Sequence, residues 1–271
     1  MTIKFKTVAA LGTLLGALAL AGCGQEEKDP NHIKVGVIVD AEQQIAEVAQ
    51  KVAKDKYGLT VELVSFNDYV LPNEALSKGD IDLNAFQHKP YLDQQIKDRG
   101  YKLVAVGNSF VYPIAGYSKK IKSLDELQNG AQIALPNDPT NLGRSLLLLQ
   151  KQGLVKLKDN VGLLPTVLDV VENPKNLKLV ELEAPQLPRS LDDDQIALAI
   201  INTTYASQIN LTPTKDGLFV EEKDSPYVNL IVSREDNKDA ANVKKFVQAY
   251  QSDEVYEAAN KIFNGGAVKG W

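Results

Sequence analysis

Sulfur-containing and imidazole side chains are scarce in this 271-residue chain, which has one cysteine, one methionine and two histidines. A single cysteine excludes an intramolecular disulfide, so the fold depends on its hydrophobic core. A Ser-His-Asp triad or a histidine-bound zinc ion would need His32 or His88, and no second ligand stands at zinc-like spacing beside His88. The run from Asp192 to Asp194 lacks the spacing and the glycine of a calcium-binding EF-hand loop. We therefore expect no metal ion and no cofactor.

The chain also lacks a net positive charge and, after its N-terminal region, long apolar segments. The formal net charge is −5, and this mild acidity argues against a nucleic-acid ligand, which selects basic surfaces. After the N-terminal region, no apolar run approaches the ~20 residues of a membrane-spanning helix. The sequence has no G-x-x-x-x-G-K-[ST] motif for ATP and no G-x-S-x-G motif for a serine nucleophile. A hydrolase that uses only Asp and Glu is the enzyme alternative that stays open.

The N-terminal segment indicates export from the cytoplasm. Lys4 and Lys6 precede an apolar run from Val8 to Leu20, which is shorter than the ~20 residues needed to span a bilayer. A positive segment, a short apolar segment and small residues before a cleavage site are typical of a secretory signal. The sequence Leu-Ala-Gly-Cys at 20–23 resembles the bacterial lipobox, in which the cysteine is lipidated and becomes the first mature residue.

Lipidation would explain the lone cysteine. We expect a lipoprotein signal peptide over 1–22, acyl chains such as palmitate on Cys23, and a flexible polar tether over 23–32. Each buried lipid CH₂ contributes about 0.8 kcal/mol, so two or three chains hold a protein on a membrane. The alternative is a stray thiol in an ordinary secretory signal. Removal of Lys4 and Lys6 with the signal changes the formal charge from −5 to −7.

Strand-like runs and helical patterns alternate through the mature sequence. The run "IKVGVIV" at 33–39 predicts a buried parallel strand, and 41–58 carries apolar residues at helical spacing up to Gly58. Ser123 and Glu126 predict a capping box. The alternation predicts an α/β fold in which parallel sheets are covered by helices on both faces. Further strands are expected at 59–66, 101–110, 131–136, 177–183, 195–201 and 225–232, and further helices at 88–100, 138–153, 239–251 and 252–263.

Two separate series of strands and helices predict two lobes. We expect the chain to cross between them at 111–118 and again at 223–227. Lobe 1 then contains 33–112 and 227–271, and lobe 2 contains 113–226.

Four long stretches resemble the NlpA-type substrate-binding lipoproteins, and the match is nearest to the methionine-binding members that serve ABC importers. The stretches are "FNDYVLPNEALSKGDIDLNAFQHKPYLDQQ" (66–95), "NDPTNLGRSLLLLQ" (137–150), "INTTYA" (201–206) and "SPYVNLIV" (225–232), and the likeness extends to the C-terminal "GGAVKGW". The resemblance implies a type II-like periplasmic binding protein fold with two connecting segments and a ligand cleft between the lobes. Such a cleft agrees with the rule that ligands of open α/β sheets bind beyond the carboxyl ends of the strands.

The same resemblance implies a function. The chain would be a monomeric, lipid-anchored receptor on the periplasmic face of the cell membrane, with the inner membrane favoured. It would capture methionine and deliver it to an ABC permease driven by a cytoplasmic ATPase, without enzymatic activity. D-methionine, a methionine-containing dipeptide or another apolar amino acid stay open as ligands, because related apolar side chains differ by only about 1–3 kcal/mol per methylene in binding.

Three polar residues are expected to hold the charged groups of a free amino acid. Arg144 can donate two parallel hydrogen bonds to a carboxylate, although an arginine at this place could also lie along the surface. Asn202 and Asn229 can accept hydrogen bonds from an ammonium, with a helix cap as the alternative for Asn202. The two asparagines fall on different predicted lobes.

The ligand side chain is expected to lie among aromatic residues. Sulfur gains about 0.3–1.5 kcal/mol per contact with an aromatic ring, which suits a thioether. Without the resemblance, Phe86 and Tyr112 would be assigned to the core and His88 to a structural role. The resemblance implies pocket positions at Tyr69, Phe86, His88 and Tyr112.

Overall fold

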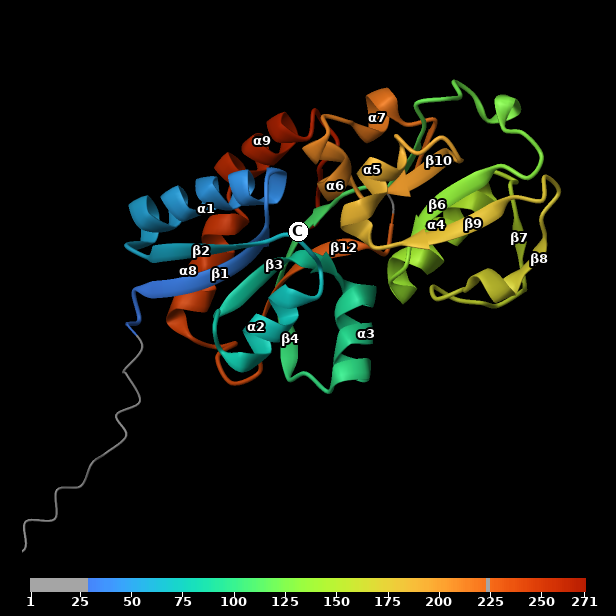
Figure 1. Ribbon diagram of the computed structural model, residues 1–271. Helices are drawn as coiled ribbons and strands as arrows, with labels where there is room; N and C mark the ends of the chain where they lie inside the picture. The colour runs from blue at the N-terminus through green and yellow to red at the C-terminus, as the bar shows by residue number, and fades with distance from the viewer. Residues whose placement is uncertain (1–28, 223–224) are drawn as a thin grey trace, which may run out of the picture.

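The computed structural model describes residues 29–222 and 225–271, which form two α/β lobes, each built around its own β-sheet (Figure 1). The predicted two-lobed α/β class is thus confirmed. The expected lipobox and Cys23 lie outside the described residues. Within the two described ranges, no helix has the length and apolar character needed to cross a membrane.

The first sheet has six strands and is covered on both faces. Its strand order is β13 (Val268–Lys269), β4 (Leu103–Val111), β12 (Val228–Arg234), β3 (Leu83–His88), β1 (His32–Ile38) and β2 (Thr60–Phe66). Its helices are α1 (Ala41–Tyr57), α2 (Leu71–Lys78), α3 (Lys89–Arg99), α8 (Ala241–Tyr250) and α9 (Asp253–Ile262). Ile231 of β12 packs in the core with α1, α8 and α9, whereas Leu230 and Val232 pack with α2 and α3. The alternation along β12 places the two helix groups on opposite faces.

The expectation of purely parallel sheets is wrong for β12. Strand β1 pairs in parallel with β2 and β3, as its Val- and Ile-rich sequence predicts. Strand β12 instead lies antiparallel between β3 and β4. Its start pairs with the end of β3, where Asn229 lies opposite His88. The chain returns from the second lobe at the carboxyl end of β3, so β12 can enter the sheet only in the opposite direction.

The second sheet has five strands, in the order β11 (Phe219–Val220), β5 (Ala115–Tyr117), β10 (Ile196–Ile201), β6 (Gln132–Pro136) and β9 (Lys178–Leu182). The strands β10, β6 and β9 run parallel, while β5 and β11 add antiparallel pairings. Its helices are α4 (Pro139–Lys151), α5 (Leu187–Ser190), α6 (Thr203–Gln208) and α7 (Pro213–Asp216). Ile133 and Leu135 pack with α4, and Ala134 between them packs with α5 and α6. Helices therefore cover both faces here too.

The chain passes twice between the sheets. It leaves the first sheet at the end of β4 and joins the second at β5, and it returns between β11 and β12. Beyond the two sheets, β7 (Lys156–Leu157) and β8 (Val170–Glu172) form an antiparallel pair.

The capping box expected at Ser123 is wrong. This residue precedes a 3₁₀ helix at Leu124–Glu126, and its side chain makes no capping hydrogen bond. The Glu126 carboxylate accepts instead from the backbone N–H of Lys122 (3.2 Å). A capping box forms at another 3₁₀ helix, Val167–Asp169, which Thr166 precedes. A third 3₁₀ helix spans Ala184–Gln186.

Candidate ligand-binding site

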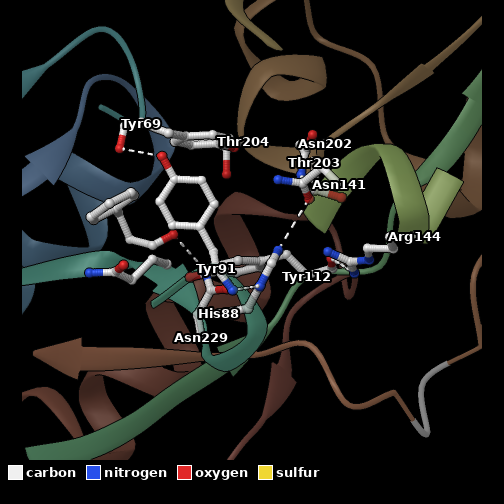
Figure 2. A pocket seen from close by; sticks show the side chains of 12 residues that line it. Tyr69, His88, Tyr91, Tyr112, Asn141, Arg144, Asn202, Thr203, Thr204 and Asn229 are labelled. Carbon is white, nitrogen blue, oxygen red and sulfur yellow. Dashed lines mark hydrogen bonds between the residues drawn. The ribbon is translucent and has the colours of Figure 1, made fainter. Parts of the chain in front are cut away.

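A pocket lies between the lobes (Figure 2), and the space between its atoms, open solvent included, is about 350 Å³. All seven residues proposed from the sequence line it, together with five others. The lining residues are Tyr69, Phe86, Gln87, His88, Tyr91, Tyr112, Asn141, Arg144, Asn202, Thr203, Thr204 and Asn229.

His88 is fixed by its position at the junction of β3 and α3. Its Nδ1 accepts a hydrogen bond from the backbone N–H of Tyr91 (3.1 Å) and so caps the helix. Because Nδ1 accepts, the ring proton is assigned to Nε2, which donates to Asn141 Oδ1 in the other lobe (3.2 Å). Burial and the nearby charge of Arg144 lower the pKa of His88 to about 3. The imidazole is therefore neutral at neutral pH, and both of its nitrogens are engaged.

The start of α4 orients Asn141. Asp138 caps this helix by accepting from the backbone N–H of Asn141 (2.9 Å), and it also accepts from the Asn141 side-chain amide (2.9 Å). The side-chain oxygen of Asn141 then faces the pocket, where it accepts from His88 and from Asn202 Nδ2 (2.9 Å). Figure 2 shows Asn141 between the other two residues.

Asn202 presents an unused acceptor. It is 6% exposed and lies between β10 and α6, and its side chain forms no capping hydrogen bond to that helix. Its Nδ2 is committed to Asn141, and its Oδ1 is buried without a hydrogen-bond partner among the described residues. Buried polar atoms in native proteins are nearly always paired, so this oxygen is placed to accept from a ligand.

Asn229 supplies a second amide from the other sheet. It lies in β12 opposite His88, and it is 7% exposed. Its Nδ2 donates to the carbonyl oxygen of Phe86 (3.0 Å), so the side-chain oxygen is left as the acceptor on the pocket side. Asn229 thus lies in the first sheet, Asn202 follows a strand of the second, and both line one pocket.

Arg144 is buried rather than spread along the surface, since only 3% of its side chain is exposed. Its Nε donates to Glu221 Oε1 (2.9 Å), and its Nη2 donates to Glu221 Oε2 and to the carbonyl oxygen of Tyr112 (3.0 Å). The guanidinium carbon lies 4.3 Å from the centre of the Tyr227 ring, in a cation–π contact. Because Nε and Nη2 are engaged, Nη1 is the guanidinium nitrogen that remains for a ligand.

Aromatic rings form the apolar side of the cavity. Tyr69 stacks on Phe86 with ring centres 5.8 Å apart, and it lies 5.0 Å from Tyr205. The Tyr91 hydroxyl donates to the backbone oxygen of Tyr69 (2.9 Å), which fixes the segment that carries Tyr69. Tyr112 packs its ring on Phe263 at 4.7 Å.

Sequence reasoning missed five lining residues and the acid that pairs with Arg144. For two of the five lining residues, their spacing from a predicted site residue could have indicated the pocket. Asn141 is three positions before Arg144 on one helix, so both fall on the same face. Tyr91 follows His88 by three positions. Gln87, Thr203 and Thr204 adjoin predicted residues, whereas nothing in the sequence around Glu221 indicates a buried ion pair.

The arrangement favours binding over chemistry. The pocket offers donors at Arg144, acceptors at two amides and an aromatic wall. Its lining residues include no carboxylate, and its one histidine is neutral with both nitrogens engaged. Across the described residues, no group of three or more His, Cys, Asp or Glu side chains could hold a metal ion.

Comparisons with known proteins identify the family to which the chain is similar. The profile of the NlpA lipoprotein family matches residues 33–271. The D-methionine-binding lipoprotein MetQ of Escherichia coli (strain K12) is 88% identical to this chain over 271 residues, which is 100% of both chains.

Solved structures of methionine-binding proteins are also similar to this chain. A crystal structure of the methionine-binding protein MetQ has 90% sequence identity and a TM-score of 0.89, and it covers 90% of this chain and 99% of that one. A nutrient-binding protein from Burkholderia cenocepacia, solved with methionine bound, is 53% identical with a TM-score of 0.86, covering 88% of this chain and 100% of that one.

Proposed function

The chain belongs to the NlpA lipoprotein family, and from this premise we propose that it captures methionine in the periplasm and delivers it to an ABC importer. The observation that carries the proposal is one buried pocket in which a guanidinium and an unpartnered amide oxygen converge beside aromatic rings. A zwitterionic amino acid needs both kinds of partner, because an unpaired buried charge costs binding free energy.

Each part of the ligand has a proposed partner. The carboxylate lies against Nη1 of Arg144, and the ammonium donates to the side-chain oxygens of Asn202 and Asn229. The thioether lies among the aromatic and imidazole rings of Tyr69, Phe86, His88 and Tyr112, where sulfur–ring contacts favour it. Tyr91 and Asn141 hold this frame in place through their hydrogen bonds to Tyr69 and His88.

Capture requires the lobes to close, and several hydrogen bonds cross between them. His88 donates to Asn141, and Thr204 Oγ1 donates to Glu42 Oε1 of α1 at 2.5 Å. A ligand held by both lobes favours the closed arrangement by its difference in affinity for the closed and open states. The closed protein then docks on the permease, whose ATPase powers import.

The remaining assignments rest on the sequence. A lipid on Cys23 anchors the protein at the periplasmic face of the inner membrane, and the protein acts as a monomer without enzymatic activity. We place lobe 1 at 33–112 with 227–271 and lobe 2 at 113–226, which is supported by the two passages of the chain between the sheets.

The ligand can be identified directly. Native mass spectrometry of the undialysed protein is expected to release methionine, and titration calorimetry after unfolding and refolding then compares L-methionine, D-methionine, methionyl dipeptides and leucine. Both methionine enantiomers are tested because the Escherichia coli relative is named for the D form. Release of a dipeptide, or tighter binding of leucine, would replace methionine as the ligand. Cleavage of a methionyl dipeptide would favour the hydrolase alternative.

A further inference from the structure

The arginine assigned to the ligand carboxylate already holds a carboxylate of the protein. Glu221 pairs with Arg144 through two parallel hydrogen bonds, to Nε and to Nη2. The exposed fractions of the two side chains are 3% for Arg144 and 13% for Glu221. Charges so far removed from water interact strongly with each other and with any charge that enters the pocket.

Glu221 is held where the segment that joins β4 to β5 meets the segment that joins β11 to β12. Its backbone N–H donates to the carbonyl oxygen of Ile114 (2.9 Å), and the N–H of Ile114 donates back to the Glu221 carboxylate (3.4 Å). Arg144 donates to Tyr112, two residues before Ile114. The acid is therefore fixed by the fold, so it cannot simply swing away when a ligand carboxylate arrives.

The pocket is electrically balanced before a ligand binds. Among the described residues that line it, Arg144 is the sole ionised side chain, because the imidazole of His88 is neutral at neutral pH. Burial raises the pKa of Tyr69, Tyr91 and Tyr112, so these hydroxyls are protonated. Glu221 cancels the charge of the arginine.

We propose that Glu221 determines the charge preference of the cleft: by neutralising Arg144 it makes the pocket select ligands with one carboxylate and one ammonium over ligands with only one of these charges. Without Glu221 the pocket would hold an uncompensated positive charge, which attracts a lone carboxylate and repels an ammonium. This inference rests on the proposed function and deepens it, because it names the ligand class as a zwitterion of zero net charge.

Three ligands without added bulk test the inference. They are methionine, 4-(methylthio)butanoate, which lacks the ammonium, and 3-(methylthio)propylamine, which lacks the carboxylate. Calorimetry on the wild-type protein is expected to rank methionine above both. In Glu221→Gln, methionine gains at its carboxylate and loses at its ammonium, whereas the anion only gains and the cation only loses. The ratio of methionine affinity to anion affinity should fall by about tenfold or more, and cation binding should weaken.

The neighbouring residue, Glu222, provides a matched control. Glu222 pairs with Lys151 at 2.5 Å, and its side chain is 69% exposed. Glu222→Gln removes the same charge one position along the chain and should leave all three affinities unchanged within about twofold, since exposed pairs contribute little. If Glu221→Gln does not fold, Glu221→Asp and Glu221→Asn are compared instead, because their side chains have equal length and differ in charge. The ratio of methionine affinity to anion affinity is measured in both variants.

The outcomes separate this inference from the function. If the wild-type protein binds no methionine, the proposed function fails and this inference fails with it. If the wild-type protein binds methionine but Glu221→Gln weakens all three ligands by one factor, or changes none of them, only this inference is overturned. A retained wild-type ranking in Glu221→Asp, together with the tenfold change in Glu221→Gln, supports it.

Discussion

His88 and Asn141 form a hydrogen bond between the two lobes, with Nε2 and Oδ1 3.2 Å apart. One residue ends a strand of the first sheet, and the other lies in the first turn of a helix that covers the second. Both are buried, and each is fixed by a second contact: His88 by the N–H of Tyr91, and Asn141 by Asp138. The bond therefore reports directly on whether the lobes are together.

Loss of the Asn141 side chain should weaken methionine binding. In Asn141→Ala, His88 Nε2 and Asn202 Nδ2 both lose their acceptor in the closed protein, and a buried donor without a partner costs about 1–3 kcal/mol. Calorimetry measures the loss. The exposed Asn129, whose oxygen accepts from Asn176, gives a control in Asn129→Ala. Equal affinities in the two variants would show that the bond between the lobes does not support binding.

Removal of the Arg144 side chain should weaken methionine binding more than removal of the Asn141 side chain. The ligand carboxylate would lose its charged partner in a buried site, so Arg144→Ala is expected to weaken methionine binding by about 2–5 kcal/mol. Arg189→Ala in α5, where the side chain is exposed, is the control and should change binding by under about 0.5 kcal/mol. A loss below about 1 kcal/mol in Arg144→Ala, measured by calorimetry on folded protein, would remove Arg144 from the site.

Glu42 should make stability depend on pH. It is 1% exposed, and burial raises its pKa from 4.5 to about 8, so the folded state keeps a proton that the unfolded state releases above pH 4.5. The contribution of Glu42 to the free energy of unfolding should therefore fall as pH rises from about 4.5 to about 8, by up to about 1.4 kcal/mol per pH unit, and then level off.

Glu42→Gln removes this contribution and keeps an acceptor for Thr204. Thermal melts of this variant and of the wild type should diverge in favour of the variant as pH rises through the window. The two proteins are compared with each other because His88, whose pKa is lowered from 6.5 to about 3, contributes an opposite dependence between about pH 3 and 6.5 in both. The exposed Glu47 supplies the control, Glu47→Gln. Parallel curves would mean that Glu42 is ionised in the folded protein.

Replacement of Cys23 should separate anchoring from binding. Cys23→Ser removes the proposed site of lipidation, so the protein should leave the membrane fraction, while the affinity for methionine should stay unchanged because none of the described residues that line the pocket precedes Tyr69. Cell fractionation followed by immunoblotting measures the distribution. Retention of Cys23→Ser at the membrane would contradict the lipobox assignment.

The sequence predicts elements with a clear period better than their pairing. The parallel strand at 33–39 and the helix ending near Gly58 follow from residue type and spacing, and both are present. The direction of β12 does not follow from its own residues, since it depends on where the chain returns from the second lobe. The short strands β5 and β11 have too few residues for a period, and they form by pairing with neighbours in space.

The site divides in the same way. Residues within matching stretches, such as Arg144 and Asn229, could be proposed from sequence, and the structure brings them into one pocket, although the ligand they hold stays a prediction. Glu221 could not, because "EEKD" at 221–224 has the composition of a solvated loop. Only the contact between the second connection and α4 places this acid on the guanidinium.

A crystal structure of the purified protein with methionine tests the proposed zwitterion site most directly. We expect the carboxylate within hydrogen-bond distance of Arg144 Nη1, with Glu221 still in place, and the ammonium within 2.7–3.2 Å of the side-chain oxygens of Asn202 and Asn229. Methionine outside this cavity, or an ammonium bound by neither asparagine, would contradict the proposed binding mode.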